Sequence, residues 1–161
     1  VFSSESVVQL CDKYHVFSRQ ELKAREDIEL EQYLKTLHTE ASLAIRMART
    51  QIYPAAVRYR QELASSAAAC ASVGVPASLD TLKELSDIIG KFEAALHVLE
   101  DRNAALAWAP GEEGLLASAR EAQHTVIPAM EELRRWADKL ETRVADDLWP
   151  LPSYLEMLFM K

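Results

Sequence analysis

Residues 80–106 read DTLKELSDIIGKFEAALHVLEDRNAAL, and their apolar positions repeat at helical spacing. The side chains that share one face follow each other in alternating steps of three and four: Leu82, Leu85, Ile89, Phe92, Leu96, Leu99, Asn103 and Leu106. Such steps place all of them on one side of a helix and are typical of a seam between packed helices. We therefore predict a long helix here that starts at Ser78 or Asp80 and packs against other helices.

Asn103 is the polar member of this seam. A buried asparagine can fix the register of two packed helices, at a cost in stability. The same residue lies near the expected end of the helix, where a polar side chain can reach water. The sequence leaves both interpretations open.

A longer helix is predicted from residue 18 to about residue 63. It begins with a capping box, in which the Glu21 N–H donates to the Ser18 hydroxyl and the Ser18 N–H donates to the Glu21 carboxylate. Its apolar face consists of Leu30, Leu34, Leu37, Ala41, Ala44, Ala48, Ile52, Ala55, Tyr59 and Leu63. Pro54 should kink this helix near residues 50–52 rather than end it, because the apolar face resumes in phase.

Two further helices complete the predicted fold. One runs from about Leu115 to Val144 around Pro128, with one face formed by Leu116, Ala119, Ala122, Val126, Met130, Leu133, Ala137, Leu140 and Val144. The other is a short amphipathic helix over residues 3–14, whose apolar side chains are Val7, Val8, Leu10, Cys11 and Tyr14. Turns at 72–77 and 108–114 join the long helices into an antiparallel bundle. The helix from residue 18 outspans its partners, so we expect its N-terminal half to project and contact something else.

The composition supports an all-α protein of one domain. The 161 residues are 49% apolar and 27% charged, with four glycines and six prolines. We divide the domain into residues 1–17 (helix and link), 18–145 (bundle of three long helices, two of them kinked by proline) and 146–161 (tail). A net charge of −7 argues against a nucleic-acid surface. The sequence shows neither a signal peptide nor an apolar run long enough to span a membrane, and we interpret Cys11 and Cys70 as reduced thiols of a cytoplasmic protein.

The tail reads DDLWPLPSYLEMLFMK over residues 146–161. Its two prolines fix φ and bias the residues before them towards extended geometry, so the segment is stiff. Its apolar side chains need a surface to cover. We predict that it docks, through an interface formed by Trp149, Pro150, Pro152, Tyr154, Leu158 and Phe159.

The sequence contains few candidates for chemistry. Glu121 and His124 have the Glu-x-x-His spacing that di-iron bundles use twice, but here the pair occurs once, so a solvated polar face is the alternative. Four arginines of the long helix could bind an anion or pair with nearby glutamates: Arg46, Arg49, Arg58 and Arg60. We predict no catalytic, cofactor-binding or metal-binding residue in this chain.

Three segments together resemble the C-terminal helical region of type III glutamine synthetases. They are residues 146–159 (DDLWPLPSYLEMLF), residues 13–22 (KYHVFSRQEL) with Arg25 and residues 31–33, and residues 40–41 and 47–48 leading into 51–55 (QIYPA) and Tyr59. They occur in the order and at the spacing of that family. At Ala24 and Glu26 the chain departs from the pattern, which has serine and an aromatic residue there.

The resemblance implies that the chain is the non-catalytic C-terminal domain of a cytoplasmic ligase. Such enzymes make glutamine from glutamate and ammonia with ATP and Mg or Mn, in a large ring-shaped oligomer, and their active sites lie in the preceding catalytic portion. The implied role is structural, with the catalytic domain and neighbouring subunits as partners. The first residue is Val1 rather than Met, which suggests a piece of a longer protein. The alternatives are a free-standing helical scaffold and a carboxylate-bridged metalloenzyme that uses Glu121 and His124.

Overall fold

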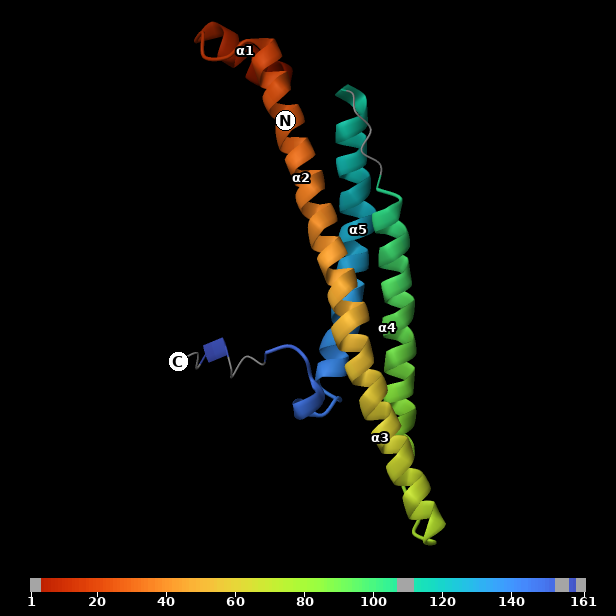
Figure 1. Cartoon of the computed structure of the whole chain (residues 1–161). Helices are drawn as coiled ribbons and strands as arrows, with labels where there is room; N and C mark the ends of the chain where they lie inside the picture. The colour runs from red at the N-terminus through yellow and green to blue at the C-terminus, as the bar shows by residue number, and fades with distance from the viewer. Residues whose placement is uncertain (1–3, 107–111, 153–156, 159–161) are drawn as a thin grey trace.

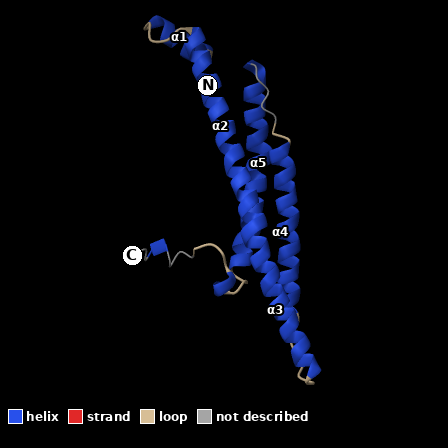
Figure 2. Ribbon diagram, in the orientation of Figure 1, coloured by secondary structure: helices blue, strands red, loops and turns tan. Residues whose placement is uncertain are grey.

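A computed structural model of the chain describes residues 4–106, 112–152 and 157–158. Its elements, in chain order, are the helices α1 (Glu5–Lys13), α2 (Arg19–Met47), the π-helical turn η1 (Ala48–Ile52), α3 (Tyr53–Ser72), α4 (Asp80–Ala104), α5 (Glu112–Glu141) and the 3-10 turn η2 (Asp146–Leu148). These residues form helices and loops but no strand (Figure 2). The prediction of an all-α protein is confirmed.

The long helices form an antiparallel bundle, as predicted (Figure 1). α2, η1 and α3 follow one another as one extended rod, α4 returns alongside it, and α5 reverses again to contact both α4 and α2. At one end, α1 and the start of α2 lie beyond the described ends of α4 and α5, which agrees with the predicted projection. At the other end, the last turns of α3 extend past the end of α5.

The rod begins and ends at well-defined caps. The predicted capping box is present: the Glu21 N–H donates to Ser18 Oγ at 3.3 Å, and the Ser18 N–H donates to Glu21 Oε2 at 2.8 Å. The predicted end near residue 63 was wrong, because α3 continues to Ser72. There Gly74 takes a positive φ of 76°, and the Val75 N–H donates to the Cys70 carbonyl at 3.0 Å, as in a Schellman cap.

Pro54 lies just after the π-helical turn. Proline has no N–H for the carbonyl of Thr50, and its ring would collide with that carbonyl in a regular α-helix. A widened turn at Ala48–Ile52 relieves this collision and keeps the rod continuous. α5, by contrast, runs as an α-helix through Pro128. The bends that we expect at the two prolines stay predictions.

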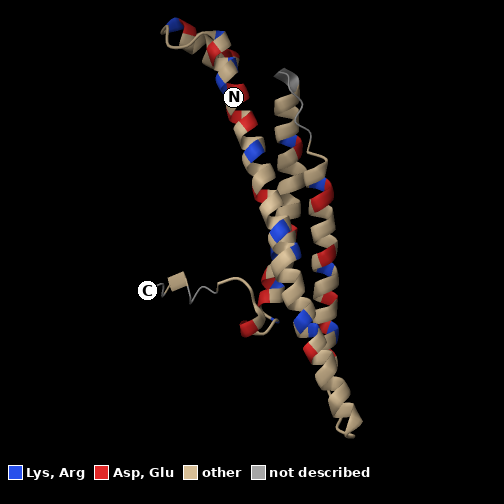
Figure 3. Cartoon of the chain, viewed as in Figure 1, with Lys and Arg blue, Asp and Glu red and all other residues tan. Residues whose placement is uncertain are grey.

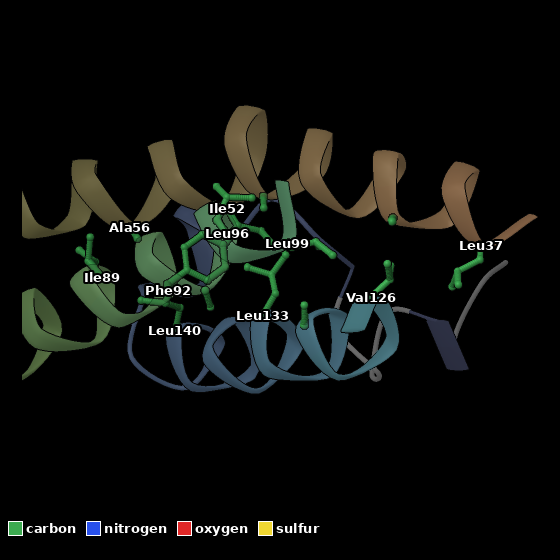
Figure 4. Packing of buried hydrophobic residues seen from close by; sticks show 14 of the residues in the cluster. Leu37, Ile52, Ala56, Ile89, Phe92, Leu96, Leu99, Val126, Leu133 and Leu140 are labelled. Carbon is green, nitrogen blue, oxygen red and sulfur yellow. The ribbon is translucent and has the colours of Figure 1, made fainter. Parts of the chain in front are cut away.

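The core lies along the seam of α4. Phe92 is fully buried and packs with Ile89 and Leu96 of its own helix and with Leu133 and Leu140 of α5 (Figure 4). Of the predicted α4 face, Leu82 is half-buried and these members are buried: Leu85, Ile89, Phe92, Leu96, Leu99, Asn103 and Leu106. The helix face read from the sequence is therefore the face that packs.

Three residues predicted on apolar faces are exposed instead. Leu10 of α1 and Tyr14, which directly follows α1, are exposed to solvent, since a helix at the edge of a bundle buries only a narrow strip, which here contains Val8. Leu116 lies in the first turns of α5, at the end of the bundle, where fewer neighbours cover it.

Asn103 joins two helices across the core. Its side chain is 8% exposed, and its Nδ2 donates to Ser42 Oγ of α2 at 3.1 Å. A polar link of this kind is satisfied only when α4 and α2 keep one longitudinal alignment. The structure thus favours the interpretation of Asn103 as a register device over that of a polar residue at a helix end.

An ion pair also ties η1 to α4. Arg49 donates to Glu100 through Nε and, at 2.5 Å, through Nη2. These hydrogen bonds, followed by the charge of Arg49 and a smaller contribution from His97, lower the pKa of Glu100 below its usual value of 4.5. A carboxylate whose pKa is lower in the folded state stabilises the fold at pH values above the pKa it has in the unfolded chain. That contribution is lost as the pH falls through the pKa it has in the folded state.

We therefore expect Glu100→Gln to lower the free energy of unfolding at pH 7, and this difference from the unmodified chain to shrink steadily as the pH falls below 4.5. Urea denaturation at a series of pH values measures it. Asp101→Asn, which removes the neighbouring exposed carboxylate of α4, is the matched control. A difference that is as large in acid as at neutral pH would contradict the role given to this pair.

Candidate docking site

The C-terminal segment starts from a turn fastened to the bundle. After α5 ends, Val144 is buried, and Arg143 Nη2 donates to Glu84 Oε1 at the start of α4, at 2.6 Å. The short turn η2 then contacts α3. The first residues of the predicted tail are thus held against α3, directly after a segment that is tied to α4.

Trp149 is the anchor of this segment. Its backbone is extended, with φ −72° and ψ 122°, and its N–H donates to the Ala145 carbonyl at 3.1 Å. The indole is half-buried and packs against the core together with Leu148 and Leu151. Its Nε1 is buried without a hydrogen-bond partner among the described residues. The front of the tail therefore lies on its own bundle.

Met157 and Leu158, the described residues nearest the end of the tail, lie away from the bundle. Met157 is 47% exposed and Leu158 is 79% exposed, and Figure 1 shows this end standing clear of the helices. Pro150 and Pro152 are also exposed. Tyr154 and Phe159, the other two residues of the predicted interface, fall outside the described part of the chain.

A groove of about 770 Å³ runs between the rod and α5, next to the point where the tail leaves the bundle. Its apolar walls include Leu37, Met47 and Ile52 from the rod and Ile127, Met130 and Ala137 from α5. Phe92 of α4 and Leu151 of the tail also line it. The tail therefore already contributes one side chain to this surface.

Charged side chains border the groove. Glu40, Glu131 and Asp138 are exposed carboxylates, and Arg134 is an exposed cation. Arg134 Nε lies 3.9 Å from Asp138 Oδ2, which is a loose ion pair. The border is thus more acidic than basic. Charges occur on each of the long helices, although the last turns of α3 carry none (Figure 3).

The other sequence candidates do not gather into a site. Arg49 is paired with Glu100, as the structural alternative predicted, whereas Arg46 and Arg58 are exposed. Glu121 and His124 are both exposed on α5. Across residues 4–106, 112–152 and 157–158, no three His, Cys, Asp or Glu side chains form a group that could hold a metal ion. None of the described helices is both long and apolar enough to cross a membrane.

Comparisons with known proteins relate both the first helices and the rest of the chain to the same kind of protein. Residues 1–71, which contain α1, α2, η1 and nearly all of α3, match the family model of the glutamine synthetase C-terminal domain. This chain is a relative of that domain.

Curated glutamine synthetases extend the likeness across the remaining helices. Over 151 residues the chain is 30% identical to a glutamine synthetase of Bacteroides fragilis (strain YCH46), a match that covers 91% of this chain and 21% of the relative. It is 26% identical to a type-3 glutamine synthetase of Dictyostelium discoideum (99% of this chain, 22% of the relative). A glutamine synthetase of Butyrivibrio fibrisolvens is 30% identical (97% and 22%). The chain spans about a fifth of the length of these relatives.

The groove was not predicted from the sequence. Periodicity identified which faces of α2 and α5 are apolar, but not how far apart those faces lie. A usable signal was the small side chains at Ala44 and Ala48 on the rod and Ala137 on α5, all of which line the groove. Small residues on two facing helices leave space unless the helices approach closely.

If Trp149 anchors the tail, Trp149→Ala should lower the free energy of unfolding by about 1–2 kcal/mol, because a half-buried indole loses part of the stabilisation of a fully buried one. Urea denaturation followed by far-UV circular dichroism measures this loss. The exposed Leu158 supplies the control, and Leu158→Ala should change stability by less than about 0.5 kcal/mol. Equal losses in the two variants would mean that Trp149 does not anchor the tail.

Proposed function

We propose that this chain is the non-catalytic C-terminal domain of a type III glutamine synthetase and helps to hold subunits of that enzyme together. The observation that carries the proposal is the match of nearly the whole chain to glutamine synthetases of which it spans about a fifth. The type III assignment rests on the type-3 relative and on the sequence signatures of the tail and the long helix.

In this proposal the whole protein is a cytoplasmic ligase that makes glutamine from glutamate and ammonia with ATP and Mg or Mn. The described residues offer no group of metal-ligating side chains that would fit such an ion. The chemistry belongs to a catalytic domain elsewhere in the polypeptide, and this domain contributes surfaces.

The proposed partners are the catalytic domain and neighbouring subunits. Residues 18–145 supply a stiff bundle, residues 1–17 a short helix at its projecting end, and residues 146–161 the docking segment. The proposed interface consists of Trp149, Pro150, Pro152, Tyr154, Leu158 and Phe159. Two features support it: the firm anchoring at Trp149 and the exposed apolar end at Leu158.

A free-standing scaffold protein would share these docking features. The coding sequence upstream of Val1 distinguishes the two cases. A catalytic domain encoded in frame there supports the glutamine synthetase assignment, whereas a start codon without one would overturn it.

In the full-length enzyme, truncation before Trp149 should weaken subunit assembly. Each side chain of the tail that is buried against another subunit contributes about 1.5–3 kcal/mol by area. Loss of even one lowers the association constant of the subunits roughly tenfold or more. Sedimentation velocity and glutamine synthesis, both followed against enzyme concentration, measure the effect. Lys161→Ala is the control and should leave assembly intact. A truncated enzyme with unchanged oligomeric state and full activity would refute the docking role.

A further inference from the structure

The tail ends in an apolar segment that its own bundle does not cover at the described positions. Leu158 is 79% exposed and Met157 is 47% exposed. Residues 154–160 read YLEMLFM, of which six are apolar or aromatic. A segment of this composition gains free energy when a partner removes it from water.

The groove between the rod and α5 is an apolar surface that can cover such a segment. Its walls come from α2, η1 and α5, and Phe92 lines it from α4. Met47 and Met130 stand on opposite walls, and methionine side chains adapt to an incoming apolar group because they are unbranched and flexible. Its volume of about 770 Å³ can accept several side chains.

We propose that the groove of one copy of this chain binds residues 154–160 of a second copy, and that the exchange is reciprocal. This inference rests on the proposed assembly role and names the surface that the tail covers. Leu151 of the same chain already lines the groove, so the inserted segment would extend an existing contact between tail and bundle.

The geometry of the tail favours a second copy over the chain's own groove. Trp149 and Leu151 are held on the bundle, while Pro150 and Pro152 fix φ and keep the residues before them extended. A stiff segment anchored in this way does not readily reverse direction. Leu158 is exposed and stands clear of the helices (Figure 1). Seven residues span at most roughly 23–25 Å, and less where Met157 and Leu158 are helical.

Charged groups at the border restrict how this occupant lies. The segment carries Glu156 within it and Lys161 directly after it. The groove offers Arg134 on one side and a set of carboxylates that includes Glu40 and Glu131. Opposite charges on the border of an apolar contact orient the incoming segment more than they strengthen its binding. Because each copy has one tail and one groove, two copies related by a twofold axis satisfy both, and the assembly closes.

Sedimentation equilibrium of the 161-residue chain, whose core is built from its own helices, tests the exchange. The unmodified chain should be a dimer. Leu158→Glu, in the tail, and Met130→Glu, in the groove, should each raise the dissociation constant at least tenfold. Val98→Glu replaces a half-exposed residue of α4 that does not line the groove, and it should leave the dimer unchanged. Urea denaturation of each variant shows whether it is folded.

Mixing the two disruptive variants gives a sharper result. The Leu158→Glu chain keeps an intact groove and the Met130→Glu chain keeps an intact tail, so a mixture should form a heterodimer through one exchanged segment although neither variant dimerises alone. Failure of a folded mixture to associate would overturn the proposal, as would a dimer that tolerates both substitutions.

Dimerisation of the 161-residue chain and truncation of the full-length enzyme test two different claims, the tail exchange and the assembly role. A 161-residue chain that stays monomeric overturns the exchange. If truncation before Trp149 still weakens the full-length enzyme, the assembly role survives, and the tail then docks on the catalytic domain. If the truncated enzyme assembles normally while the isolated chain dimerises through its tails, the exchange is supported and the assembly role in the enzyme fails.

Discussion

Burial of the α4 seam between the rod and α5 is the interaction on which the other features of this protein depend. Phe92 sits at its centre, fully buried against side chains of α5 and next to the floor of the groove. The core and the groove are therefore adjacent. A change in how tightly α5 packs on α4 would alter the width of the groove, which links the stability of the bundle to its capacity for binding.

The prolines give this helical protein its shape at two places. Pro54 is accommodated by a π-helical turn whose residues Ala48 and Ile52 form part of the groove wall. Pro150 and Pro152 direct the tail away from the surface on which Trp149 is anchored. Proline cannot donate a backbone hydrogen bond. In the first case it shapes a wall of the groove, and in the second it shapes the tail that we propose to bind there.

The helices and their packing faces could be predicted from the sequence because they depend on local periodicity and on caps such as the Ser18–Glu21 box. The end of α3 was placed too early, since an Ala-rich and Ser-rich stretch has no apolar repeat to follow, and the cap at Gly74 decides where the helix stops. Exposure of Leu10, Tyr14 and Leu116 was not predictable, because it depends on how many helices cover each end. The groove depends on the distance between two helices, which no single-helix pattern contains.

The central claim is that this domain acts by inserting its tail into the groove of a neighbouring copy. A cryo-electron microscopy structure of the assembled enzyme that contains this chain tests it most directly. The account predicts that residues 154–160 of one subunit fill the groove between α2 and α5 of another. A groove filled by its own tail or by the catalytic domain, with Leu158 buried elsewhere, would contradict it.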